Sequence, residues 1–290
     1  MNKLPIEKRK QIINLLVEGN SLRATTRICD VSINTVTKLL VDIGKACEKF
    51  HDEKVCNVKA TRVQADEMWS FVYSKEKNVP DGMEGEAVDV WTWTALDADT
   101  KLMISWYVGN RDAMSAREFM MDISTRLTNR VQLTTDGFRP YIKAVDAAFD
   151  DEIDFAQVVK IYGTPDSVGN DKRYSPAQCT GAEKHVIEGR PDEKHISTSY
   201  VESQNLTMRM HMRRFTRLTN AFSKKVENHA YAIALHFVCY NFCKVHKSLR
   251  VTPAMEAKLA TKPMTIEDIC SLAPIEAPKK RGPYKKKYTS

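Results

Sequence analysis

The chain has 290 residues, of which 42% are hydrophobic and 28% charged, an ordinary balance that predicts a soluble globular protein able to bury a sizeable core. No apolar run is long enough to cross a bilayer, and the first residues, MNKLPIEKRKQII, lack the apolar core of a secretory signal. We therefore expect a cytoplasmic, nucleoid-associated protein with no membrane partner. The net charge of +7 is modest, so its placement matters more than its size.

Positive charge gathers in two segments. Residues 279–290 hold six basic side chains and no acidic one, and a second basic cluster covers residues 209–225. Local concentrations of this kind suit a phosphate backbone, although a solvated tail and a solvated helix face are the plain alternatives. The seven cysteines form no CxxC pair and no zinc-finger spacing, so we expect reduced thiols and no structural zinc.

The first fifty residues predict three helices, over residues 5–18, 22–29 and 33–44. Ser21 is the expected cap of the second helix. The third helix has a buried stripe of Val36, Leu39, Leu40 and Ile43, and its outer side begins with Asn34, Thr35, Thr37 and Lys38. A short helix, a tight turn and a helix that opens with polar side chains are typical of a helix-turn-helix, in which these residues touch base edges. A generic three-helix bundle is the alternative.

From about residue 60 the period changes. Residues 62–74, 86–100 and 101–110 predict three strands, the last two as a hairpin, followed by an amphipathic helix that Asp112 opens. A fourth strand, VQLTTDG, and a helix around RPYIKAVDAAF come next. This order predicts an α/β fold, a ribonuclease-H-like mixed sheet with flanking helices, preceded by an all-α helix-turn-helix domain.

The chain divides into three parts on this interpretation. Residues 1–57 would form the helix-turn-helix DNA-binding domain and residues 58–250 the ribonuclease-H-like catalytic domain. Residues 163–199 lack a clear period and are expected to be an irregular insertion in that domain. Residues 251–290 would add a C-terminal helix and the basic tail.

Three carboxylates lie at special points of this pattern. Asp66 is inside the first strand, where an unpaired charge is costly. Asp136 closes the fourth strand just before Gly137, and Glu202 lies in the first turn of a helix after the insertion. Since the first and fourth strands would be neighbours and a later helix can cross their ends, the three could converge. Glu67 competes with Asp66, but alternation along a strand should bring only one of them to the site.

Such a cluster suits Mg²⁺ or Mn²⁺, because hard cations take oxygen ligands. Two ions would support in-line displacement at phosphorus, with Asp66, Asp136 and Glu202 as both metal ligands and catalytic residues. Turn or surface acids without any metal are the alternative for each residue taken singly.

The helix of Glu202 also carries basic residues. Arg209 follows Glu202 by two turns on the same face. Arg213, Arg214 and Arg217 would continue a positive surface along DNA, unless they form only the solvated face of an amphipathic helix.

Four blocks of sequence, ADEMWSFV, LTTDGFRPY, STSYVESQNLTMRMHMRRFTRLTNAFSKK and YNFCKVHKSLRVTPAMEA, resemble the DDE transposases of the insertion sequence one family. The resemblance covers residues 60–257 approximately and is most distinctive around Glu202. It implies a ribonuclease-H-like catalytic core, magnesium dependence and recognition of terminal inverted repeats. The two aspartates and the glutamate of the family fall on Asp66, Asp136 and Glu202, and its basic residue falls on Arg209.

One departure from the family concerns the N-terminus, because several members begin with a zinc finger and this chain has no matching cysteines there. End recognition would rest on residues 5–45. The leading hypothesis is a transposase that acts on double-stranded DNA, at terminal repeats and target, as a homodimer or larger assembly. A catalytically inactive helix-turn-helix regulator is the first alternative, and a ribonuclease-H-type nuclease on hybrids the second.

Overall fold

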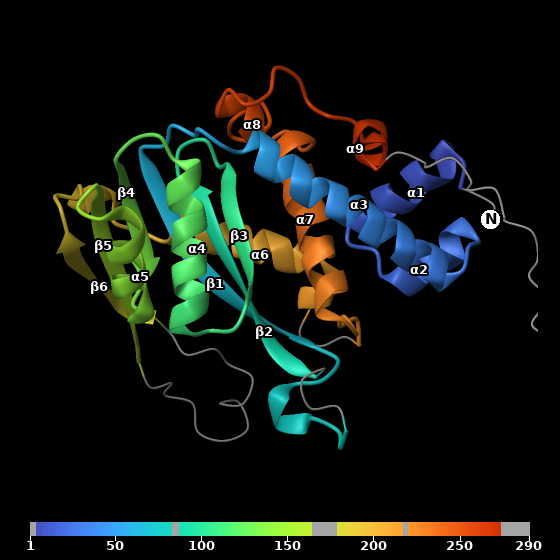
Figure 1. Cartoon of the computed structure of the whole chain (residues 1–290), viewed down its shortest axis with the longest axis horizontal. Coiled ribbons are helices and arrows are strands. Elements are labelled where there is room, and N and C mark those ends of the chain that lie inside the picture. Colours follow the sequence, from blue (N-terminus) through green and yellow to red (C-terminus); the bar gives the residue numbers. More distant parts are fainter. Residues whose placement is uncertain (1–3, 83–86, 164–178, 217–219, 274–290) are drawn as a thin grey trace, which may run out of the picture.

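The computed structural model describes residues 4–82, 87–163, 179–216 and 220–273. The basic tail and Arg217 lie outside the described residues. Figure 1 places the N-terminal helices at one end of the molecule and the sheet at the other. Among the described residues, no helix is both long enough and apolar enough to span a bilayer.

The N-terminal helices are α1 (Ile6–Val17), α2 (Leu22–Cys29) and α3 (Ile33–Lys54). Ser21 caps α2 as predicted, since its side chain accepts a hydrogen bond from the Ala24 backbone N–H at 3.1 Å, and Ser32 caps α3 in the same way. The predicted stripe of α3 is confirmed as buried. The predicted end of α3 near Gly44 is wrong. Gly44 lies inside the helix, where a Cβ atom would come within 2.4 Å of Tyr231, so the missing side chain serves a close helix crossing.

The central sheet has six strands in the order β3-β2-β1-β4-β5-β6. Their bounds are β1 Arg62–Val72, β2 Val88–Asp97, β3 Met103–Gly109, β4 Val131–Asp136, β5 Ile153–Tyr162 and β6 Cys179–Glu188. β4 runs parallel to both β1 and β5, and the other pairs are antiparallel. The predicted β2–β3 hairpin and the predicted contact of the first and fourth strands are confirmed. The mixed sheet with flanking helices is the predicted ribonuclease-H-like class.

Two strands were missing from the sequence-based prediction. β5 was not assigned, and β6 lies inside residues 163–199, which were expected to be irregular. β6 is an edge strand with almost every side chain exposed, so it has no buried face and hence no alternating apolar pattern. Its pairing with β5, rather than its own composition, makes it a strand.

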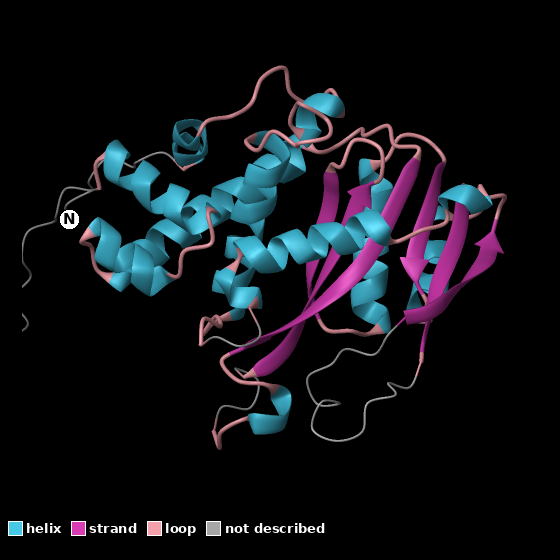
Figure 2. Ribbon diagram, turned by 180° about the vertical axis from the view of Figure 1, so that it is seen from behind, coloured by secondary structure: helices cyan, strands magenta, loops and turns pink. Residues whose placement is uncertain are grey.

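Helices cover both faces of the sheet, as the two opposite views show (Figures 1 and 2). They are α4 (Ala113–Arg126), α5 (Pro140–Phe149), α6 (Ser199–His211) and α7 (Val226–Phe242), followed by the short α8 (Pro253–Glu256) and α9 (Ile266–Leu272). Asp112 caps α4 as predicted. Short 3-10 helices lie at Glu76–Asn78, Glu193–His195 and Arg213–Phe215.

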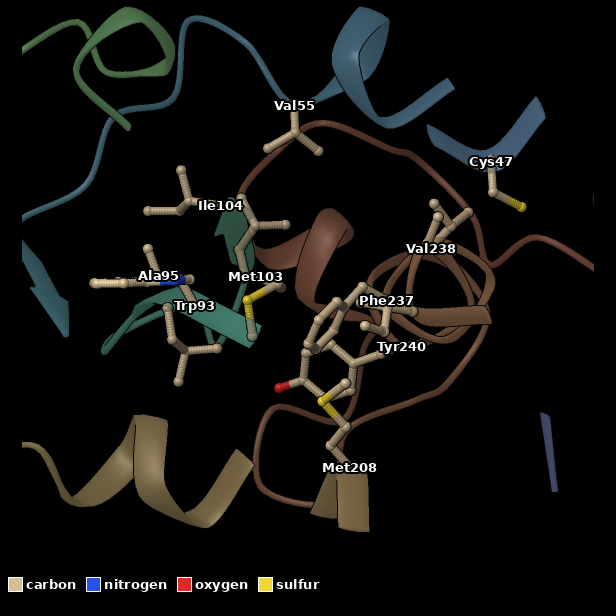
Figure 3. Close-up of a cluster of buried hydrophobic side chains, with 14 of the residues drawn as sticks. Cys47, Val55, Trp93, Ala95, Met103, Ile104, Met208, Phe237, Val238 and Tyr240 are labelled. Atoms are coloured by element: carbon tan, nitrogen blue, oxygen red, sulfur yellow. The ribbon is translucent and has the colours of Figure 1, made fainter. Parts of the chain in front are cut away.

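The two faces can be told apart by their contacts. On one face Trp93 of β2 packs against Phe119 of α4 and Tyr141 of α5, with ring centroids 5.8 and 5.5 Å apart. On the other, Trp106 of β3 packs against Phe237 of α7. Figure 3 shows Phe237 with Met103 and Met208 in the buried cluster between α6, α7 and the sheet. One hydrophobic core runs from the N-terminal helices to α9. Burial of each large apolar side chain in it adds about 1.5–3 kcal/mol to the stability of the folded state.

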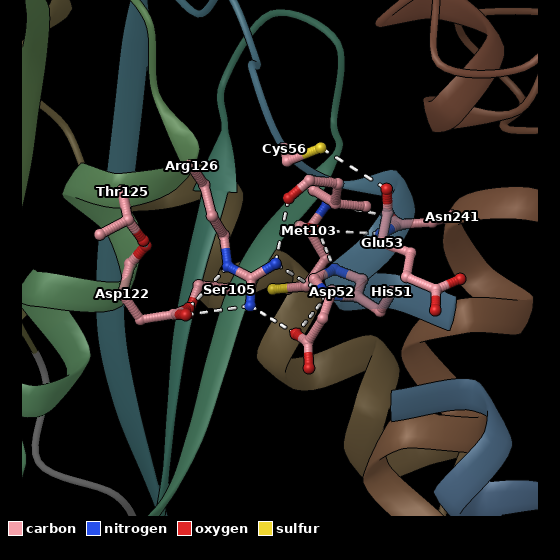
Figure 4. Close-up of polar contacts among 11 residues, drawn as sticks. His51, Asp52, Glu53, Cys56, Met103, Ser105, Asp122, Thr125, Arg126 and Asn241 are labelled. Carbon is pink, nitrogen blue, oxygen red and sulfur yellow. Dashed lines mark hydrogen bonds and ion pairs between the residues drawn. The ribbon is translucent and has the colours of Figure 1, made fainter. Parts of the chain in front are cut away.

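A polar cluster around Arg126 fixes the end of α3 to the sheet (Figure 4). Its guanidinium donates to Asp52 of α3 at 2.6 Å, to Asp122 of α4 at 2.7 Å and to the Val55 carbonyl at 3.0 Å. His51 Nε2 lies 3.3 Å from the Met103 carbonyl oxygen of β3. These bonds hold the N-terminal helices in a defined position relative to the sheet.

Candidate functional site

Asp66 and Asp136 lie side by side on the two central strands of the sheet. The parallel pairing of β1 and β4 ends at Ala65↔Thr135, and these aspartates are the next residue of each strand. The Oδ1 atom of Asp136 accepts the Phe138 backbone N–H at 3.1 Å, which fixes its side chain in a tight turn. The strand order in the sequence predicted that Asp66 and Asp136 would lie close together, and the pairing of β1 with β4 places them on neighbouring strands.

α6 crosses the sheet beside Asp66 and contributes Asn205. The Asn205 amide donates to Asp66 Oδ2 at 2.8 Å, and its own oxygen accepts from the Thr94 hydroxyl of β2 at 3.1 Å. Burial is the largest cause that raises the pKa of Asp66, from 3.8 to about 7, and the carboxylates of Glu67 and Asp136 raise it further. The Asn205 amide thus orients Asp66, but it lowers the pKa by less than burial and the neighbouring carboxylates raise it.

Glu67 joins this cluster, contrary to the expectation that only one of the two neighbours would face the site. Carboxylate oxygens of Asp66, Glu67 and Asp136 all lie within 4.8 Å of one another. Glu67 points to the opposite face of the sheet, where Tyr141 donates to it at 2.9 Å. Because β1 runs on beyond the end of its pairing with β4, no strand separates the two faces there, and both side chains approach Asp136.

A guanidinium closes the cluster from the Glu67 side. Arg111 Nε donates to Glu67 Oε1 at 2.6 Å, and Arg111 Nη2 lies 3.7 Å from Asp136 Oδ2. The central guanidinium carbon of Arg111, Cζ, also lies 4.1 Å from the centroid of the Phe138 ring. Burial is the first cause that raises the pKa of Asp136, and Arg111 lowers it in part.

Glu202 lies in the first turn of α6, as predicted. It is close enough to raise the pKa values of Asp66 and Asp136, for which burial is the larger cause. It is not part of the group of oxygens within 4.8 Å. Its Oε2 accepts a hydrogen bond from Lys160 of β5, and its Oε1 accepts one from the Thr198 hydroxyl. Asp66, Asp136 and Glu202 therefore influence one another electrostatically, but the hydrogen bonds of Glu202 are to residues outside the group of close oxygens.

Arg111, Lys160 and Asn205 are site residues that the sequence interpretation missed. Asn205 could have been found, because it follows Glu202 by about one turn on the same helix. Arg111 precedes the cap of α4, which is only a weak signal. Lys160 carried none, since β5 itself was not assigned.

The basic residues after Glu202 do not form one helical row. Arg209 lies on α6, but α6 ends at His211, and Arg213 and Arg214 belong to a 3-10 turn. Arg213 is exposed. Arg214 donates to the Ser223 hydroxyl, and burial lowers its pKa to about 10, so it faces the interior more than a surface along DNA.

The predicted base-reading residues lie on the first turns of α3. Asn34 and Lys38 are exposed, and Thr35 and Thr37 are partly exposed. The Thr35 hydroxyl is within 2.8 Å of the Ser32 hydroxyl, and the Thr37 hydroxyl donates to the Ile33 carbonyl at 2.9 Å. These bonds orient the two threonines, while the two longer side chains remain open to a partner.

The cluster fits a divalent cation. Its donors are all carboxylate oxygens, the ligands that Mg²⁺ and Mn²⁺ prefer over softer sites. The raised pKa values of Asp66, Glu67 and Asp136 each have burial as their first cause, and nearby carboxylates raise all three further. A cation among these oxygens would relieve both effects, whereas among the described residues no other group of three such side chains lies this close.

Comparisons with known proteins give distant structural neighbours only. No protein-family model matches the chain, and no curated protein sequence matches it either. A cryo-EM structure of the piggyBac transposase synaptic complex with hairpin DNA aligns with a TM-score of 0.38 and 10% identity, over 92% of this chain and 69% of the other. The Mos1 strand transfer complex aligns with a TM-score of 0.23 and 12% identity, over 81% and 76%, respectively. A pre-cleavage Mos1 transpososome gives 0.23 and 9%, over 82% and 79%. Similarity of this degree transfers no residue's role.

Proposed function

We propose that this chain is a DDE-type DNA transposase that cleaves and joins DNA strands at the inverted-repeat ends of an insertion sequence. The observation that carries the proposal is that Asp66 and Asp136 meet where the parallel pairing of β1 and β4 ends, with Glu202 of α6 close enough to raise the pKa of both. The motif blocks over residues 60–257, which resemble the insertion sequence one family, support it independently.

Asp66, Asp136 and Glu202 would hold two Mg²⁺ or Mn²⁺ ions, with Glu67, whose oxygens accept from Arg111 and Tyr141, beside them. Such a pair, when bound, activates the attacking oxygen and stabilises the leaving one in displacement at phosphorus. Asn205 sets the direction of the Asp66 carboxylate, which removes a rotational freedom that a loose ligand would have to lose. Arg111 lies beside Asp136, where its remaining N–H groups suit a phosphate oxygen.

DNA would be bound by three parts of the chain. Asn34, Thr35, Thr37 and Lys38 at the start of α3 would touch base edges in the major groove, in the manner of a helix-turn-helix. Arg209 and Arg213 would contact the backbone next to the carboxylates, and the basic residues 279–290 would add sequence-independent attraction. A homodimer or larger assembly would hold both ends of the element together.

The test is a strand-transfer assay with DNA that carries the element's own ends, with and without Mg²⁺ or Mn²⁺. We expect joined product only with metal, and its loss in Asp66→Asn, Asp136→Asn and Glu202→Gln while end binding persists. Asp146→Asn, in an exposed acid of α5, is the matched control and should join normally. End binding without cleavage in either metal would favour the helix-turn-helix regulator, and cleavage of RNA–DNA hybrids alone would favour the nuclease.

A further inference from the structure

Lys160 stands on the same face of the sheet as the two aspartates. Asp136 pairs with Val158 of β5, and Lys160 lies two residues further along that strand, so side-chain alternation returns it to the same side. Its ammonium reaches Glu202 on α6 and forms an ion pair there. The side chain of Lys160 is 33% exposed and that of Glu202 is 36% exposed, so solvent reaches both partners.

Both oxygens of Glu202 are engaged in this arrangement. Lys160 donates to Oε2 and the Thr198 hydroxyl donates to Oε1. Each oxygen keeps a further lone pair, but a metal ion that binds Glu202 would lie close to both donors. The Thr198 hydroxyl can rotate its hydrogen away from Glu202. The Lys160 ammonium, in contrast, carries a full positive charge that a nearby divalent cation would repel.

The charges around the site show where that ammonium would go. Four carboxylates, Asp66, Glu67, Asp136 and Glu202, surround two cationic side chains, Arg111 and Lys160. Without metal the formal charge is negative, and Lys160 is held by Glu202. With two divalent ions the same residues become net positive, which favours an anion. A Lys160 ammonium released from Glu202 beside a bound DNA strand would then pair most favourably with a phosphate oxygen.

We propose that Lys160 is a phosphate-binding residue of this site that exchanges partners: it is paired with Glu202 before metal binds and with a phosphate oxygen of the DNA strand once metal has taken Glu202. This inference rests on the proposed function for its metal. A purely structural ion pair is the alternative. A pair this exposed contributes about 0–1 kcal/mol to stability, so structure alone gives little reason for its position.

The first experiment measures Mn²⁺ binding to the full chain without DNA. Lys160→Met removes the competitor for Glu202, so we expect Mn²⁺ to bind about two- to fivefold more tightly than in the unaltered protein. Lys160→Arg keeps the charge and should leave the affinity unchanged. Lys143→Met, in an exposed lysine of α5, is the matched control. Weaker Mn²⁺ binding in Lys160→Met would mean that the lysine supports Glu202 as a ligand, and would overturn the exchange.

The second experiment measures binding of a nicked DNA duplex of arbitrary sequence as a function of salt, once with Ca²⁺ and once with EDTA. Each phosphate contact adds about 0.9 to the slope of log affinity against log salt. Lys160→Met should lower that slope by about 0.9 with Ca²⁺ and leave it unchanged with EDTA, because Glu202 holds the ammonium when metal is absent. Strand transfer should fall about tenfold to a hundredfold.

The outcomes separate this inference from the function on which it rests. An unchanged slope in both conditions would show that Lys160 meets no phosphate, and an equal decrease in both would show that Glu202 does not restrain it; either result overturns the exchange. If the unaltered protein joins strands with metal in those cases, the proposed function stands without it. If the unaltered protein binds no divalent ion, the proposed function fails and the exchange fails with it.

Discussion

Asp66→Asn should stabilise the metal-free protein while it destroys the metal site. The substitution keeps the shape of the side chain, and the new carbonyl can still accept the Asn205 hydrogen bond. It removes a charge that is buried next to Glu67 and Asp136. We therefore expect a gain in the free energy of unfolding, because a costly desolvated charge disappears and no bond is lost.

The pKa of Asp66 gives the size and the sign of this gain. Its folded value of about 7 lies above the ordinary 3.8, so the folded state retains a proton that the unfolded state releases between these two values. Stability then falls as pH rises through that window, and above it the ionised group costs up to about 4 kcal/mol. We expect Asp66→Asn to be more stable by about 1–4 kcal/mol near pH 8, with less than half of that gain left near pH 5.

The assay is urea unfolding in EDTA across this pH range. Asp146→Asn serves as the control and should stay within about 0.5 kcal/mol of the unaltered protein at every pH. Saturating Mg²⁺ should then stabilise the unaltered protein by about 2–3 kcal/mol at a hundred times its dissociation constant, and Asp66→Asn far less. An Asp66→Asn protein that is no more stable than the unaltered one near pH 8, or whose advantage does not shrink with falling pH, would refute the reasoning from burial and repulsion.

Three further predictions concern other parts of the molecule. Asn205→Ala leaves Asp66 without its amide donor, so strand joining should slow about tenfold or more while gel-shift DNA binding is unchanged; equal joining rates would deny Asn205 its orienting role. Gly44→Val places a side chain against Tyr231 and should cost about 3 kcal/mol in urea unfolding, and a cost under about 1 kcal/mol would show that α3 and α7 can separate there. The buried His236 has a pKa lowered from 6.5 to about 3 by desolvation, and its Nε2 has no hydrogen-bond partner within the described part of the chain. Because a lowered histidine pKa makes stability fall as pH falls below 6.5, His236→Phe should gain about 2 kcal/mol on the unaltered protein between about pH 6.5 and about pH 5. A constant difference over that range would contradict the buried, neutral imidazole.

Local patterns in the sequence predicted most of the described helices and the first four strands. Ser21 and Asp112 are caps whose side chains bond to the backbone three residues on, so the signal and the structure lie within one turn. The buried stripe of α3 repeats with the helical period and needs no knowledge of its partner. The end of α3 was misplaced because Gly44 looks like a stop, and only the crossing with α7 explains why a glycine lies inside that helix.

The candidate site divides in the same way. Asp66 could be found because it is a charged residue inside a recognisable apolar strand, Asp136 because it ends one, and Glu202 because it lies in the first turn of a recognisable helix. Glu67 was excluded because side chains alternate between the two faces of a paired strand. That rule does not separate Glu67 from Asp136, because β1 continues beyond the end of its pairing with β4. Arg111 and Lys160 reach the carboxylates from separate segments, so no spacing in the sequence links them to the site.

The sequence by itself therefore determined the elements with a buried face, the positions of the three carboxylates and the polar start of α3, because burial and capping leave periodic marks within a few residues. Only the tertiary structure decided that β6 is a strand, that Glu67 joins the aspartates and that Lys160 holds Glu202. Each of these depends on a partner far away in the chain: an exposed edge strand and an ion pair between β5 and α6 bury too little surface to impose a pattern on their own sequence.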